Sequence, residues 1–418
     1  MAGTSSTQKQ TVMQRENMDP LLYKAAREGD VALLLKSILE RPSPPDPLLS
    51  RTPQKNTALH IAVKFGRENI VKEIQMIPRL ASLISKTNFR GDTPLHMAAS
   101  AGHLPITQLL TPTLEEGTSW GIAAAASEVW TMKNLEGSTA FHEALKKGHE
   151  EVALHLLRFE KRLAHEVNDA KESPLYLAAE AGLLGVVIEI LHGGEFSTKG
   201  LDGQNPLHIA AIKGRIGVVE ILLKHAPHPS NFIRMVDDFG KTALHYASTI
   251  GYYGDVNSEV HTRTCILSLL LKANPSPAYV PDKNGDYPLL IATIKAPFEA
   301  VRTILEHCPD SADLINKEGQ NALHLAVKKK SEAVIQYLLT WPEFRKMINE
   351  PDEEGNTPMH LATKTNSKEI VELLFHCEGV DLAVTNKKWP HSSGYVWGHE
   401  GTGDGYYNCR KLQIREYS

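Results

Sequence analysis

Histidines recur at one position of a repeating pattern, and histidine is both a common metal ligand and a common acid–base catalyst. The pattern reads Thr-x-Leu-His in its clearest copies, and its histidines are His60, His96, His142, His208, His245, His324 and His360. Metal ligands must converge on one point, whereas one histidine per repeat is spread along the molecule by about 10 Å per step. The recurrence therefore argues against a metal site or a catalytic centre.

Other features that resemble reactive sites fail on spacing or context. His142-Glu143 does not extend to the HExxH of zinc hydrolases, and His391, His399 and Cys409 are not spaced like a closed zinc site. The stretch GTGDG at 401–405 lacks the strand and helix that a phosphate loop requires, and no nucleophile elbow or kinase signature occurs. We therefore predict no catalytic residue, no metal and no cofactor, and we expect that the protein is not an enzyme.

The elements that would hold these histidines repeat along most of the chain. Most copies are spaced by roughly 35 residues, and they begin near residues 20, 57, 93, 139, 173, 205, 242, 287, 321 and 357. Five positions into every copy stands an alanine, which lets neighbouring helices approach closely. These alanines are Ala25, Ala62, Ala98, Ala144, Ala178, Ala210, Ala247, Ala292, Ala326 and Ala362.

Turn residues divide each copy into smaller elements. Nine positions in, a glycine suited to end a helix in the left-handed conformation is found in most copies. It is Gly29, Gly66, Gly102, Gly148, Gly182, Gly214 and Gly251, whereas the last three copies have Ala296, Lys330 and Asn366. An apolar run at helical spacing follows, and six copies then carry Asx-x-x-Gly, the residues of a tight turn. Each copy therefore reads as helix, turn, helix and extended finger.

The predicted fold is an all-α solenoid of about ten helix-turn-helix units with finger loops, because no unit can bury its apolar face alone. We place the array at 19–388, with insertions at 111–132 and 252–264. Residues 1–18 are expected to be a disordered lead-in. The second insertion is polar and reads as a loop extension, and residues 389–418 read as a divergent, disordered tail.

The stretches DTPLHMAASAGHLPITQLL (92–110) and QNPLHIAAIKGRIGVVEILL (204–223) resemble the ankyrin repeat. The resemblance covers about 20–388 and implies that the recurrent histidine bonds the backbone of the adjacent loop. It also implies protein partners, bound on the finger tips and on the concave helix face. Tyr176 and Leu290 replace the histidine, and the unit that ends at Leu305 departs most from the pattern.

Composition limits the other function classes. A net charge of −4 does not suit nucleic-acid binding, and four widely separated cysteines form no disulfide framework, which fits a reducing compartment. The N-terminus lacks the apolar segment of a secretory signal, and no run approaches the ~18 apolar residues of a membrane helix. We expect a cytoplasmic chain that does not itself insert into a membrane.

The candidate partner-binding residues stand at finger tips and in the first insertion. They are Phe89, Arg90, Glu136, Asp202, Phe239, Lys283, Glu318, Glu354, Trp120 and Trp130. An exposed aromatic side chain at a tip is a good anchor for a partner, but either phenylalanine could instead fold against its own finger. The two tryptophans could likewise be anchors or could pack back onto the solenoid, since large exposed apolar area is unusual.

The repeat pattern stops abruptly within NKKWPHSSGYVWG (386–398), where Trp389 stands in place of the expected glycine. Arrays that begin like DPLLYKAAREGD and contain GNTPMHLATKTNSKEIVELL resemble the plant ankyrin–transmembrane proteins. That family is associated with defence, cell-death control and salt stress, and its members carry a Pro-Gly-Gly domain and membrane helices after the array. The resemblance implies a membrane-anchored parent at the plasma or another membrane, with its ankyrin part in the cytosol.

The main hypothesis is a non-enzymatic protein-binding scaffold in signalling, in plant defence or stress responses. One alternative is a soluble fragment or isoform of a membrane-anchored receptor or channel-like protein whose transmembrane domain is missing here. A second alternative is a subunit or inhibitor that blocks the active site of a partner enzyme.

The abrupt change after Lys388 predicts a splice or reading boundary at that residue. Sequencing the transcript through the Lys388 codon tests this prediction. A dominant message that continues with a glycine codon and reaches apolar segments of about 20 residues would indicate a membrane-anchored ankyrin adaptor. A message that stops after Ser418 would indicate a soluble array that competes with tethered relatives for the same partners.

Overall fold

The computed structural model describes residues 18–39, 49–77, 83–111, 129–249, 256–295, 298–387, 395–396 and 407–408. It divides into two compact units, Met1–Leu201 and Asp202–Ser418. The predictions for residues 1–17, Trp120, Gly251, Ala296, His391, His399, Cys409 and most of the first insertion and the tail lie outside the described residues.

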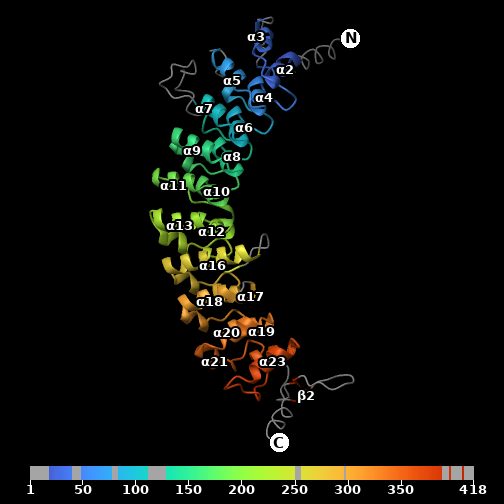
Figure 1. The fold of residues 1–418 in the computed structure, drawn as a ribbon, viewed down its shortest axis with the longest axis vertical. Helices are drawn as coiled ribbons and strands as arrows, with labels where there is room; N and C mark the ends of the chain where they lie inside the picture. Colours follow the sequence, from blue (N-terminus) through green and yellow to red (C-terminus); the bar gives the residue numbers. More distant parts are fainter. Residues whose placement is uncertain are drawn as a thin grey trace, which may run out of the picture. The chain divides into compact units, whose positions relative to one another are not determined.

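The first unit is a stack of helix pairs (Figure 1). The first helix of each pair, here called the inner helix, is α2 (Pro20–Glu28), α4 (Ala58–Lys64), α6 (Pro94–Ala101), α8 (Ala140–Lys147) or α10 (Pro174–Ala181). The second, outer helix is α3 (Val31–Leu39), α5 (Glu68–Gln75), α7 (Leu104–Leu110), α9 (Glu150–Phe159) or α11 (Leu184–His192). Inner helices contact inner helices and outer helices contact outer helices, so the unit has two layers.

The second unit repeats this arrangement. Its inner helices are α12 (Pro206–Ile212), α15 (Ala243–Ala247), α17 (Pro288–Lys295), α19 (Ala322–Lys328) and α22 (Pro358–Lys364). Its outer helices are α13 (Ile216–His225), α16 (Val256–Ala273), α18 (Phe298–His307), α20 (Glu332–Leu338) and α23 (Lys368–Phe375).

Short elements lie between the pairs or follow them. The short helices are α14 (Pro229–Arg234) and α21 (Pro342–Lys346), and the 3₁₀ turns are η4 (Lys161–His165), η5 (Leu201–Gly203), η6 (Ser276–Tyr279) and η7 (Pro309–Asp313). In the tail, β1 (Tyr395–Val396) pairs antiparallel with β2 (Tyr407–Asn408).

Helix α6 shows why the sequence forms an inner helix. Thr93 is the N-cap, and its side chain accepts a hydrogen bond from the backbone N–H of His96. Pro94 follows at a position where a missing N–H is harmless. Gly102 ends the helix at φ 71°, a left-handed conformation that favours glycine. Lys330 and Asn366 adopt the same conformation at φ 57° and 54°, so these two units end their inner helices in the same way.

The repeated alanines form the core between the inner helices, as predicted. All ten are buried. The unit that ends at Leu305 keeps the helix pair α17–α18 although Leu290 replaces its histidine, because Leu290 is itself fully buried. Apolar packing therefore maintains the pair where the polar residue is lost.

Two predicted boundaries differ from the structure. Residues 256–264 of the second insertion are not a loop, because they form the start of α16. They contain no glycine or proline, so nothing interrupts the helix whose later residues, Ile266 and Leu270, are buried. Met18 belongs to the folded array and not to the lead-in, since it is buried and its N–H donates to the carbonyl of Arg51.

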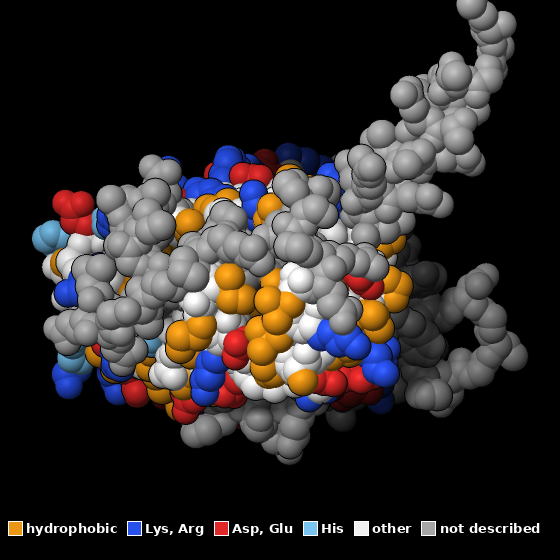
Figure 2. Space-filling model, turned by 90° about the horizontal axis from the view of Figure 1, so that it is seen from above, with side chains coloured by type: hydrophobic (Ala, Val, Ile, Leu, Met, Phe, Trp, Pro, Cys, Tyr) orange, Lys and Arg blue, Asp and Glu red, His pale blue; other side chains and the backbone are white. Residues whose placement is uncertain are grey.

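The N-terminal end of the first unit is not a fully polar cap. Figure 2 views the molecule from above and shows hydrophobic side chains beside charged ones on the described surface. Leu21 and Leu39 of the first helix pair are exposed. Among the described residues, no helix is both long enough and apolar enough to cross a membrane.

The alanine core can be tested on α6, which carries Ala98 in the core and Ala101 on the surface. Ala98→Leu should lower the free energy of unfolding by about 1–3 kcal/mol, because the larger side chain overpacks the contact between inner helices. Ala101→Leu is the matched control and should change it by less than about 0.5 kcal/mol. Urea unfolding measures both; equal effects of the two substitutions would contradict the assignment.

Candidate functional site

The fingers are tight turns held by one polar side chain. In the finger at 88–92, the Asn88 Oδ1 accepts hydrogen bonds from the N–H groups of Arg90 (2.8 Å) and Asp92 (3.0 Å). The Gly91 N–H donates to the Asn88 carbonyl at 3.1 Å, with Gly91 at φ 78°. A β-carbon on Gly91 would lie 2.8 Å from the Leu135 nitrogen, so the next finger also requires glycine here.

The Asx-x-x-Gly search missed two fingers of this type. Asn168 accepts from the N–H of Glu172, and Lys171 takes the left-handed position at φ 64°. Thr52 replaces the Asx residue in the first finger, where Lys55 is at φ 60°. A search that allowed lysine at the fourth position would have found the Asn168 finger.

Backbone hydrogen bonds join successive fingers into a ladder within each unit. In the first unit, the N–H groups of Phe89, Leu135 and Asp169 donate to the carbonyls of Gln54, Arg90 and Glu136 at 2.9, 3.0 and 3.1 Å. In the second unit, the corresponding N–H groups of Asp238, Lys283, Glu353 and Lys387 donate to the carbonyls of Asp202, Phe239, Glu318 and Glu354, respectively. The ladder fixes the distance between neighbouring tips.

Four of the recurrent histidines connect an inner helix to the next finger. The Thr93 N–H donates to His96 Nδ1 at 3.2 Å, so Nδ1 must be the acceptor and Nε2 carries the proton. Nε2 then donates to the carbonyl of Ser138, 2.9 Å away in the next unit. His60, His208 and His324 bond the carbonyls of Asp92, Lys241 and Asn356 at 3.0, 2.9 and 3.1 Å. This confirms the structural role that the resemblance implied.

Burial controls the titration of these rings. It lowers the pKa of His60, His142 and His245 to about 4 and also lowers the pKa of His96, His208 and His324. His142 and His245 keep the bond to their own threonine, at 2.8 and 2.9 Å. Their Nε2 atoms are buried without a hydrogen bond among the described residues. The rings are therefore neutral at pH 7.

The predicted tip side chains are on the surface. Phe89 is 69% exposed and Phe239 is 51% exposed, so neither is folded into its own finger. The charged tip residues Arg90, Glu136, Asp202, Lys283, Glu318 and Glu354 are exposed as well. Leu135, which follows Phe89 by one finger, is 74% exposed and was not among the predicted site residues. The ladder bond from Leu135 to Arg90 places these two apolar tips side by side.

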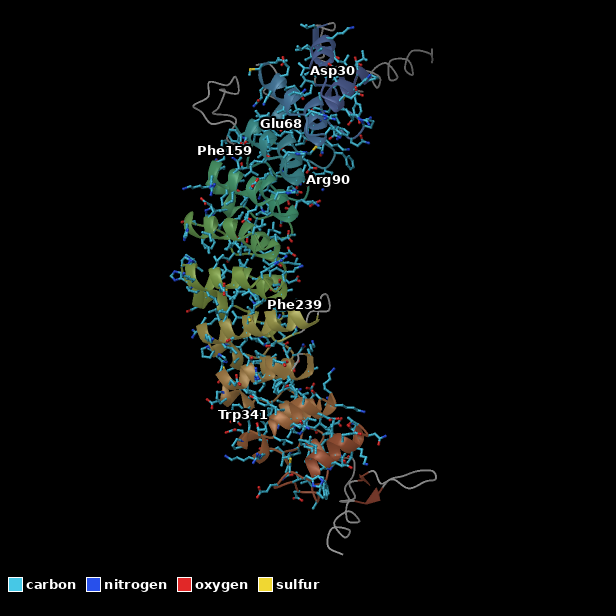
Figure 3. The ribbon with its side chains drawn as sticks, in the orientation of Figure 1. Asp30, Glu68, Arg90, Phe159, Phe239 and Trp341 are labelled. Carbon is cyan, nitrogen blue, oxygen red and sulfur yellow. The ribbon has the colours of Figure 1, made fainter. Side chains whose placement is uncertain are left out.

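Trp130 packs back onto the array. Its indole N–H donates to the carbonyl of Leu110 at 3.2 Å, and its ring meets Phe159 edge to face with centroids 4.9 Å apart. Figure 3 labels Phe159 on the outer layer of the first unit. Trp130 therefore holds the end of the first insertion against α9.

A hollow of about 430 Å³ opens between the second finger and the inner helices of the first unit. Its lining includes Phe89, Arg90 and Asp92 from the finger, Met97 from α6 and Glu143 from α8; Figure 3 labels Arg90 beside this region. Finger tips and inner helices thus meet at one concave place, and the predicted residues Phe89 and Arg90 belong to it.

Two carboxylates at the hollow share one amide. The Asn134 side-chain N–H₂ donates to Asp92 at 3.0 Å and to Glu143 at 3.4 Å. Asp92 is 8% exposed and Glu143 is 7% exposed. Burial raises the pKa of Glu143, the positive charge of Lys146 opposes this rise, and the Asp92 charge acts in the same direction as burial. The guanidinium group of Arg90 lies 3.6 Å from the carboxylate of Asp92 and 3.6 Å from that of Glu136.

The sequence analysis did not include Glu143 among the candidate site residues, although a comparison of the repeat units contains a signal for it. Glu143 stands four positions after Thr139. The corresponding residues in the other units from the second onward are Ile61, Met97, Leu177, Ile209, Tyr246, Ile291, Leu325 and Leu361. A carboxylate in this otherwise hydrophobic column is a local exception, and such exceptions are expected at functional sites.

Stacked helix pairs with a ladder of fingers define a helical repeat protein of the solenoid class. The family model for ankyrin repeats (3 copies) matches residues 22–119, 74–170, 175–258, 258–349 and 309–386. The chain therefore belongs to the ankyrin repeat family, whose fold is typically a non-enzymatic interaction module.

Three relatives illustrate the similarity. Protein ACCELERATED CELL DEATH 6 of Arabidopsis thaliana is 28% identical over 288 residues, which are 65% of this chain and 40% of that protein. The human transient receptor potential cation channel subfamily A member 1 is 25% identical over 70% of this chain and 27% of its own length. Ankyrin repeat-containing protein ITN1 of Arabidopsis is 30% identical over 33% of this chain and 20% of its own length. The matches thus span less than half of each relative.

The buried histidines predict a loss of stability in mild acid. Their pKa is near 6.5 when unfolded and about 4 for His60, His142 and His245 when folded. Between these values the unfolded chain binds more protons, so stability is full above pH 6.5 and falls as the pH falls toward 4. At pH 5.5 each of the three should reduce the free energy of unfolding by about 1.4 kcal/mol.

The measurement is the urea midpoint at pH 7.5 and at pH 5.5. His245→Leu, which introduces the residue that Leu290 provides naturally, should lower the midpoint at pH 7.5 but reduce its fall on acidification. Identical midpoints at the two pH values for the wild type would contradict the assignment.

Proposed function

We propose that this chain is a non-enzymatic scaffold that binds a protein partner across the finger tips and the concave face of its inner helices. The observation that carries the proposal is the pair of exposed apolar tips on adjacent fingers, Phe89 and Leu135, beside the hollow. Large exposed apolar side chains held on a rigid backbone are typical anchors at protein interfaces.

The surroundings of the tips suit a protein ligand. Arg90 and Glu136 flank the apolar tips and are exposed, which resembles the polar rim around the apolar centre of an interface. In the second unit, Phe239 is accompanied by Asp202 and Lys283, and the later tips carry Glu318 and Glu354. The fingers present side chains at fixed spacing, so specificity would come from the tips while the core maintains their positions.

We further propose that the chain acts in the cytoplasm in plant defence or stress signalling. The two Arabidopsis relatives support this pathway, and the name of one refers to accelerated cell death. A second candidate is that the chain is the ankyrin part of a membrane-anchored protein; the similarity over 70% of this chain to a protein named as a cation channel favours it.

Selection of a displayed random-peptide library on the full chain tests the binding proposal. Phe89→Ala should lower the affinity for peptides that bind the first unit at least about ten-fold, since it removes an apolar anchor worth about 1.4 kcal/mol or more. Phe239→Ala should do the same for peptides of the second unit. Both variants should unfold at the wild-type urea concentration.

The matched control is Leu184→Ala, which removes an exposed apolar side chain from outer helix α11. It should leave peptide affinity unchanged. If the selected peptides bind Phe89→Ala and Phe239→Ala as tightly as the wild type, the tips are not the binding surface.

A further inference from the structure

Glu143 is a buried charge that the fold only partly accounts for. The structure gives it one hydrogen bond, a long one of 3.4 Å from the Asn134 side chain. Asp92 takes the shorter bond from the same amide and also lies 3.6 Å from Arg90. A buried carboxylate needs compensation by hydrogen bonds or by an opposite charge. Asn134 is thus already held by Asp92, and Glu143 is not required to hold it.

Lys146, on the helix of Glu143, and Lys64, at the hollow, make contacts with other groups. Lys146, on the same helix, lies 3.8 Å from Glu136 and 3.5 Å from Glu172. Lys64 lines the hollow, and its ammonium lies over the Phe65 ring, 5.9 Å from the centroid. Within the described part of the chain, no ion pair includes Glu143. The Lys146 charge acts on Glu143, but no ion pair between described residues fixes the carboxylate, which lines the hollow and can accept a further cation.

The hollow has the lining that a long basic side chain requires. Phe89, Met97 and Ala101 supply apolar surface for a methylene stem, and Glu143 supplies a carboxylate for the charged end. Phe89, 69% exposed, also offers an aromatic face, which attracts cations. Arg90 already shows a guanidinium loosely held at the rim, 3.6 Å from Asp92.

We propose that this hollow receives an arginine or lysine side chain of a bound protein segment, with Glu143 as its counter-ion. The proposal rests on the proposed function and specifies the chemistry of the partner: a basic residue next to an apolar residue that contacts Phe89 and Leu135. The volume of the hollow, about 430 Å³, exceeds what one side chain fills, so the hollow also accommodates the backbone that flanks the basic residue.

The test uses the full chain and the same random-peptide library. Peptides enriched on the wild type should carry an Arg or Lys beside an apolar residue. Glu143→Gln keeps an acceptor oxygen for Asn134 but removes the charge. It should lower the affinity for these peptides at least about ten-fold. Replacing the basic residue of the peptide with Gln should have a similar effect, and the two changes together should cost little more than either alone.

Glu151→Gln is the matched control, because Glu151 is an exposed carboxylate on outer helix α9; it should leave affinity unchanged. The ¹³C-methyl signal of Met97 should shift when the peptide binds to the wild type, which locates the peptide in the hollow. The same signal in the unliganded Glu143→Gln protein reports whether the variant remains folded.

The outcomes separate the two proposals. Peptides that lack a basic residue, acidic peptides that depend on Arg90 or Lys64, or basic peptides that bind Glu143→Gln unchanged would overturn this inference. If such peptides still depend on Phe89, the proposed function stands without it. Binding that depends on none of these residues would overturn both.

Discussion

The stacking of each unit on the next is the constraint on which the array depends, and a buried histidine fixes it at four junctions, those of His60, His96, His208 and His324. The histidine Nδ1 accepts from the threonine that begins its own inner helix, and its Nε2 donates to the carbonyl that precedes the next one, as at His96. Both bonds need the neutral ring, and burial keeps it neutral. Histidine often performs acid–base chemistry in proteins. At these positions its ring fixes the register of one unit against the next.

That register determines what the surface can do. The histidine bridge of His96 and the backbone ladder hold neighbouring tips at one spacing, and Phe89 and Leu135 remain side by side without support from one another. A partner that meets these tips does not have to order them, which reduces the entropic cost of association. Beneath these tips, Asp92 and Glu143 share the amide of Asn134.

The sequence predicted features that every unit must contain, because each arises from a contact that recurs. The alanine core is of this kind, and the histidine bridge recurs at four junctions. Features that depend on one place in the chain were harder to predict. Lys171 adopts a conformation normally reserved for glycine, so its finger was missed. The outer helix α16 extends into polar residues that have no apolar periodicity.

The candidate site shows the same limit. Phe89 and Arg90 could be placed at a tip from the turn pattern alone, but exposure decided that Phe89 is free of its own finger. Glu143 was visible only as an exception in an apolar column. Its hydrogen bond comes from Asn134, which also bonds Asp92 of another finger, and no spacing rule brings those three side chains together.

Amide hydrogen exchange of the full chain, with and without a saturating selected peptide, tests most directly whether this protein works through its fingers and inner helices. The account predicts that the peptide slows exchange at 88–92 and 134–137 and along α6 and α8, while the outer helices α7 and α9 are unchanged. Protection confined to the outer helices would contradict it.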